Sequence, residues 1–218
     1  FATADLSTSM SLKGGAGTDV LAVTGAAGGG TLVSNTVGAK VSEFEVLRAE
    51  GFALNAAATL TIDGAAVSGL SEVQIQEVTG GAGAAVQVTN LDSGDKVTLL
   101  ADQALTTTLN FKATTLTETT RAMSVELGDG AGVDGTKNGV TVTDLIVAKA
   151  TDLTVNSVGG ANTVTAQTTT DLVNLKITGD KSVDFDAEIN GSNLATIDAS
   201  GMTMTKATDA GLIMSQAS

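Results

Sequence analysis

The chain has 218 residues and a formal net charge of −13, and it contains no histidine, cysteine or proline. Without histidine and cysteine it has no Ser-His-Asp triad, no histidine-ligated metal, no disulfide and no cysteine-based zinc site. So acidic a surface repels phosphate groups, and no run of about 18 apolar residues is present, so we expect neither a nucleic-acid partner nor a membrane span.

Short runs with an apolar residue at every second position follow one another along the chain, and this period predicts β-strands. In chain order they are FEVLRA at 44–49, ATLTIDG at 58–64, EVQIQEV at 72–78, AAVQVTNL at 84–91, DKVTLL at 95–100, TTLNFKA at 107–113, MSVELG at 123–128, GVTVTDL at 139–145, DLTVNSV at 152–158, NTVTAQT at 162–168, VNLKITG at 173–179, SVDFDAEI at 182–189 and LATIDAS at 194–200. A helical pattern also fits 41–50 and 209–218, and 25–40 resembles a loop. The predicted fold class is all-β.

The spacing of the runs indicates how the strands are arranged. Two runs make a unit of about 20 to 25 residues, which is the length of one coil of a parallel β-solenoid. Inward positions hold small aliphatic residues, and no Asn-Gly pair has the two-residue spacing of a tight hairpin. An antiparallel sandwich or barrel is the alternative architecture. We expect one elongated solenoid over 1–218, with turns rich in Gly and Asp, as a segment of a longer chain.

The stretch GGAGTDVLA at 14–22 matches the calcium-binding nonapeptide GGxGxDxUx, in which U is a large apolar residue. Gly15 and Gly17 permit a tight turn whose carbonyls point inward, and Asp19 adds a carboxylate to that oxygen cage. Leu21 would fill the core beneath the turn. The motif makes Gly15, Gly17 and Asp19 candidate Ca²⁺ ligands, whereas a glycine-rich turn with a solvated aspartate is the alternative.

Three further groups of carboxylates are candidate calcium ligands, because Ca²⁺ prefers oxygen donors that include Asp and backbone carbonyls. Each group could instead be solvated. GGAGAAVQV at 80–88 has Ala85 where the nonapeptide requires Asp, so it predicts a turn without a ligand. The three groups are Asp92 and Asp95 in LDSGDK, Asp129 and Asp134 in LGDGAGVDG, and Asp184 and Asp186, together with Glu188, in VDFDAEIN.

GGAGTDVLAVTG at 14–25, VSEFEVLRAEG at 41–51 and LATIDASGMT at 194–203 resemble the calcium-dependent surface-layer (S-layer) proteins that Gram-negative bacteria export by the type I route, and related large repeat-in-toxin (RTX) surface proteins. The resemblance implies a right-handed β-solenoid with Ca²⁺ at its turns. It also implies a secreted protein that forms a two-dimensional lattice on the cell surface. The implied partners are further copies of the chain, with surface polysaccharide or lipopolysaccharide as an anchor.

The sequence therefore predicts a structural, self-assembling, calcium-binding cell-surface protein. An RTX-type adhesin or biofilm-matrix scaffold is the alternative, although the chain lacks the Trp and Tyr on which sugar rings usually stack. We expect no enzymatic activity. Arg48 and Arg121 are the only arginines, and no pair of carboxylates is accompanied by a cationic partner and an aromatic wall.

Overall fold

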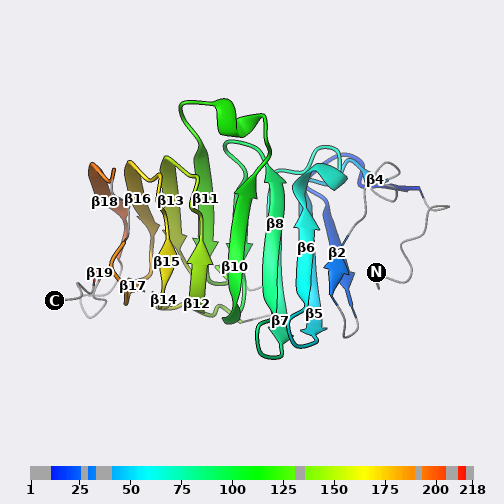
Figure 1. The fold of residues 1–218 in the computed structure, drawn as a ribbon, viewed down its shortest axis with the longest axis horizontal. Helices are drawn as coiled ribbons and strands as arrows, with labels where there is room; N and C mark the ends of the chain where they lie inside the picture. Colours follow the sequence, from blue (N-terminus) through cyan, green and yellow to red (C-terminus); the bar gives the residue numbers. More distant parts are fainter. Residues whose placement is uncertain are drawn as a thin grey trace.

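The computed structural model describes residues 11–25, 29–32, 41–130, 136–189, 193–204 and 211–214. The chain alternates between two parallel sheets that face each other along the length of the molecule (Figure 1). The first sheet contains β2 (Val20–Thr24), β5 (Val46–Leu54), β7 (Glu72–Gly80), β9 (Lys96–Leu99), β11 (Ala122–Leu127), β13 (Asp152–Ser157), β16 (Asn174–Gly179) and β18 (Thr196–Met202).

The second sheet takes up the chain after each of these strands. It contains β3 (Gly30–Thr31), β6 (Thr59–Asp63), β8 (Ala85–Leu91), β10 (Gln103–Phe111), β12 (Thr141–Ile146), β14 (Asn162–Val164), β17 (Val183–Phe185) and β19 (Leu212–Met214), with β15 (Gln167–Thr168) beside β12. A small pair joins β1 (Leu12–Lys13) to β4 (Val41–Ser42). Two short 3₁₀ turns, η2 (Gly64–Ala66) and η3 (Thr115–Thr117), lie in connections.

Every strand pair among the described residues is parallel, and each strand pairs with the strand one coil away. Coil length varies, because the paired side chains Asn174 and Asp152 are 22 residues apart whereas Asn156 and Glu126 are 30 apart. The expected parallel β-solenoid is confirmed, and the antiparallel sandwich or barrel is excluded for this part of the chain.

The core is a thin layer of aliphatic side chains stacked in register. In the first sheet Leu21, Leu47, Val73, Val97 and Val125 occupy one inward row, and all of them are buried. Because side chains alternate across a strand, each inward residue packs against the equivalent residue of the next coil. The regular period of small apolar residues in the sequence therefore fills most of the space between the sheets, together with the buried rings of Phe44, Phe52, Phe111 and Phe185.

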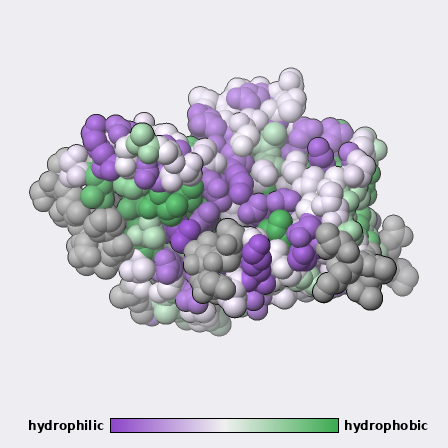
Figure 2. Space-filling model, turned by 180° about the vertical axis from the view of Figure 1, so that it is seen from behind, coloured by the Kyte–Doolittle hydropathy of each residue, from purple (hydrophilic) through white to green (hydrophobic). Residues whose placement is uncertain are grey.

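The outer face of the first sheet carries a polar ladder that links successive coils. Lys96 Nζ lies 3.4 Å from Glu72 Oε1 and 3.3 Å from Glu126 Oε1, so one cation bridges the carboxylates on both sides. Asn156 then donates to Glu126 Oε2 over 2.8 Å, and Thr178 donates to Asn156 Oδ1 over 3.0 Å. Seen from behind, the molecule has hydrophilic side chains gathered across its middle (Figure 2).

Two of the sequence-based expectations need correction. The helical alternative at 41–50 is wrong, since this stretch forms β4 and the start of β5, where strand pairing buries Val46, Leu47 and Ala49 against the neighbouring coils. In 209–218 the described residues Leu212–Met214 form a strand, and in 25–40 Gly30–Thr31 do so; most of both stretches lies outside the described residues. No helix in the described ranges is long and apolar enough to cross a membrane.

Truncation of a central core residue tests this packing. Leu99 is fully buried in register with Ile75 and Leu127, so Leu99→Ala is expected to lower the free energy of unfolding by about 2–5 kcal/mol. Urea titration followed by circular dichroism measures the change. The control is Leu116→Ala on the exposed η3 connection, where Leu116 is 44% exposed, and a change within about 0.5 kcal/mol is expected. Equal effects of the two changes would contradict the stacked core.

Candidate functional site

The predicted glycine-rich turn forms directly before β2. Gly15 and Gly17 have φ angles of +106° and +121°, in the left-handed region that glycine adopts without a steric penalty. The turn leads into β2, where Leu21 is 1% exposed. Leu21 therefore lies in the core as expected, and both glycines have the backbone conformation of a turn, while their role as ligands stays a prediction.

Asp19 meets the second coil at this turn. Its backbone N–H donates to Glu45 Oε2 over 2.8 Å, and Val46 N donates to its carbonyl over 3.2 Å. Its carboxylate atom Oδ2 is buried and accepts no hydrogen bond from the described part of the chain. A buried carboxylate oxygen without a partner is costly, and a bound cation is one way to satisfy it.

Glycine is required at position 14 because the carbonyl group of Glu43 and the side chain of Asp19 both lie close to it. A β-carbon at Gly14 would lie 1.8 Å from the carbonyl oxygen of Glu43 and 2.8 Å from Cβ of Asp19. The neighbourhood of Asp19 thus includes a backbone carbonyl and the carboxylate of Glu45, both from the next coil. Glu43 and Glu45 were not predicted from the sequence. Both residues follow the motif in the sequence by about one coil length. This spacing indicates that they lie beside the motif only once the strand register is known.

Asp92 and Asp95 lie in the tight turn between β8 and β9, where their carboxylates bind other groups of the chain. Asp95 Oδ2 accepts a hydrogen bond of 2.7 Å from Asp92 N, and so closes the turn. The Asp92 carboxylate forms an ion pair with Lys112 and accepts a hydrogen bond from Thr115 Oγ1. Burial raises the pKa of Asp95 above its usual value, and the backbone hydrogen bond from Asp92 opposes this only partly.

Asp129 is 2% exposed at the corner that follows β11, and Asp134 lies outside the described residues. The backbone N of Asp129 donates to Asn138 O over 2.8 Å. Beside this corner the side-chain amide of Asn162 lies within 3.1 Å of the carbonyl oxygens of Leu127 and Val158 and 3.0 Å from that of Gly160. An amide donor therefore binds several carbonyls of the corner at which a cation was expected.

Asp184 and Asp186, from the last of the three acidic groups, lie in two different environments. Asp184 lies on β17 and is partly buried, and its Oδ1 accepts no hydrogen bond within the described ranges. Asp186 is exposed and follows the end of that strand at Phe185. The strand predicted over 182–189 ends at Phe185, so Asp186 and Glu188 lie beyond it and the three carboxylates do not share one strand face.

The structure therefore does not bring the predicted ligands together into one site. Among the described residues, no group of three or more Asp, Glu, His or Cys side chains is placed to hold a metal ion. The described candidates lie at separate places, in the turn before β2, in the turn between β8 and β9, after β11, and on or just after β17. The turn at Asp19 has the strongest donor set, with an unsatisfied buried carboxylate oxygen and acidic residues from two coils.

Comparisons of the chain with protein-family models, with curated proteins and with solved structures gave no match.

The raised pKa of Asp95 predicts that the free energy of unfolding decreases as the pH rises in the acid range, which is opposite to the usual effect of a carboxylate in a folded protein. Because the folded-state pKa exceeds the unfolded value of 3.8, stability falls as the pH rises from that value through the folded pKa. Asp95→Asn removes this effect while keeping an acceptor for Asp92 N. The variant should be more stable than the wild type at pH 7 and equally stable below pH 3.8. Urea unfolding at both pH values measures this, and a variant less stable at pH 7 would contradict it.

Proposed function

We propose that this chain is a structural segment of a secreted, calcium-dependent cell-surface protein that assembles with copies of itself into a lattice or filament. The observation that carries the proposal is the buried, unsatisfied carboxylate oxygen of Asp19, in a turn of the calcium-binding nonapeptide type. The resemblance of three stretches of the sequence to S-layer proteins supports the same function.

Calcium at this turn would link the first two coils. Ca²⁺ takes six to eight oxygen ligands, and Asp19 and Glu45 offer carboxylates while Glu43 offers a carbonyl. These donors come from residues far apart in sequence, so the unfolded chain cannot present them together. Binding then stabilises only the folded state, and the acidic chain would stay unfolded where calcium is scarce and fold where calcium is abundant.

Two inward side chains are uncovered at the last described coil. Ile197 and Met214 lie in register with Leu175 and Phe185 of the preceding coil. Leu175 and Phe185 are 1% and 3% exposed, whereas Ile197 and Met214 are 42% and 37% exposed. A further β-layer would bury the two side chains, whether it came from the same chain or from another copy, and in the proposed assembly it comes from another copy.

A calcium titration tests the first part of the proposal. Calcium should raise the unfolding temperature, with a stabilisation of about 2.7 kcal/mol when its concentration is 100 times Kd. Asp19→Asn should lose most of this gain, while Asp198→Asn, which changes the same charge at another coil, should keep it. Calorimetry with magnesium as the control ion measures the effect. If wild type and Asp19→Asn respond alike to calcium, the site at Asp19 does not exist.

Assembly is tested separately by electron microscopy and sedimentation of the purified chain with and without calcium. Wild-type protein should form lattices or filaments, and Ile197→Lys should abolish them because it places a charge in the apolar contact. Leu116→Lys changes an exposed leucine on the η3 connection and should leave assembly intact. Wild-type protein that stays monomeric but binds surface polysaccharide would instead support the adhesin alternative.

A further inference from the structure

The corner that precedes β12 contains an Asn-Gly pair that neither the calcium turn nor the assembly contact uses. Asn138 and Gly139 lie outside any strand, just before β12 begins at Thr141. In an Asn-Gly pair the side-chain amide is open to attack by the next backbone nitrogen, because glycine has no side chain that would shield it. The pair is therefore a candidate site of chemical modification.

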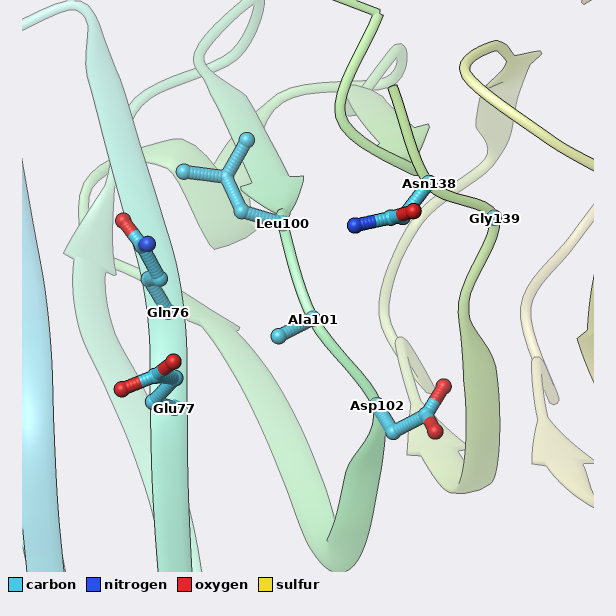
Figure 3. A pocket seen from close by; sticks show the side chains of 7 residues that line it. All are labelled: Gln76, Glu77, Leu100, Ala101, Asp102, Asn138 and Gly139. Carbon is cyan, nitrogen blue, oxygen red and sulfur yellow. The ribbon is translucent and has the colours of Figure 1, made fainter. Parts of the chain in front are cut away.

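The side chain of Asn138 is accessible to water. It is exposed, and Figure 3 shows it extending away from the backbone toward the Leu100–Ala101 segment. The cavity on that side has a volume of about 380 Å³ and is also lined by Gly139. A water molecule occupies about 30 Å³, so several waters fit beside the amide. Asn138 Nδ2 donates one hydrogen bond to the described residues, of 3.2 Å to Thr136 Oγ1, so little holds the amide in place.

The backbone nitrogen of Gly139 is available as the attacking group. No described residue accepts a hydrogen bond from it, although most backbone N–H groups of a folded protein are paired. The carbonyl oxygen of the same peptide group, Asn138 O, accepts a hydrogen bond of 2.8 Å from Asp129 N. A donor at this oxygen draws electron density from the peptide group and makes its N–H more acidic.

The fold requires the glycine of this pair. A β-carbon at Gly139 would lie 2.0 Å from Ala161 O, which belongs to the next coil. Ring closure would join the side chain of Asn138 to the nitrogen of Gly139 and would add no atom at the Cα of Gly139. The close contact with Ala161 therefore demands glycine without opposing the reaction.

We propose that Asn138 is a site of spontaneous deamidation. The lone pair of the Gly139 nitrogen forms a bond to Cγ of Asn138 and the Cγ–Nδ2 bond breaks. The proton released by Gly139 passes through water to Nδ2, which leaves as ammonia. Water then opens the resulting succinimide ring at one of its two carbonyls, and gives aspartate or isoaspartate. The whole change consumes one water and releases one ammonia, and it needs no cofactor and no enzyme.

Both products disturb the corner in which they form. An aspartate at Asn138 adds a negative charge to a cavity that Glu77 and Asp102 also line, and like charges repel. Isoaspartate in addition lengthens the main chain by its Cβ atom, where little room exists, since β-carbons at Gly128 and Gly159 would lie 2.9 and 2.2 Å from Asn138 O. The reaction thus weakens the packing of this corner against the next coil as the protein ages, whether or not calcium is bound.

Asn156 provides a matched reference within the same chain. It precedes Ser157, a small residue that also shields an asparagine poorly. The amide of Asn156 donates to Glu126 Oε2 over 2.8 Å, and Ser157 is fully buried on β13. The fold therefore restrains Asn156 and leaves Asn138 open, whereas the unfolded chain exposes both.

Peptide mass spectrometry measures the two reactions separately. The folded chain and the chain in urea are incubated at one mildly alkaline pH, and trypsin then gives peptides 138–149 and 150–176. Asn138 should react in the folded chain within about tenfold of its rate in urea, which is a difference in barrier of less than about 1.4 kcal/mol. Asn156 should react in urea only. A sample that was not incubated gives the background. A rate at Asn138 more than about tenfold below the rate in urea would overturn the proposal.

A variant tests the consequence for the fold. Asn138→Gln keeps the amide and the charge, but its longer side chain closes the corresponding ring far more slowly. After long incubation the wild-type protein should contain isoaspartate at position 138 and unfold at a lower temperature than fresh protein, whereas Asn138→Gln should show neither change. An unchanged unfolding temperature of the incubated wild type, or an equal fall in both proteins, would contradict the effect assigned to this corner.

Discussion

The structure depends on one constraint, that every coil must cover the apolar side chains of the coil before it. The rows that run through Leu21, Leu47, Val73, Val97 and Val125 meet this constraint because parallel pairing keeps equivalent residues in register. A shift of one residue would turn every inward side chain to the outside. The same constraint agrees with the composition, since the core between the sheets consists mostly of Val, Leu, Ile and Ala, with four buried Phe rings among the described residues.

The excess of negative charge is accommodated on the outside of these rows. The shared position of Lys96 between Glu72 and Glu126 lets one cation serve two carboxylates, and Arg121 similarly bonds to Asp171 across coils. Other carboxylates are used as turn acceptors, as Asp95 is for Asp92 N. The buried carboxylate oxygen of Asp19, which has no hydrogen-bond partner in the described part of the chain, is the place at which the proposed calcium ion would act.

Much of the fold could be predicted from the sequence, because the two-residue period is strong and small residues occupy the inward positions. The helical alternative at 41–50 failed because VSEFEVLRAE satisfies both periods, and only pairing with β2 and β7 decides between them. The turn at Gly15 and Gly17 was predictable from its motif. The contact of Glu45 with Asp19 was not, since coils of unequal length hide which distant residues become neighbours.

The arrangement of the strands also determines how the molecule would yield under force. In the described part of the chain, the strands lie across the long axis, so the backbone hydrogen bonds between neighbouring strands run along it, and each coil contacts mainly the coils on either side of it. Tension applied through the two ends of the chain would therefore peel off one coil after another and would not break the whole sheet at once. With coils of 21 to 39 residues, each event would release roughly 70–140 Å of extended chain. Such a segment would lengthen under tension in a series of small steps.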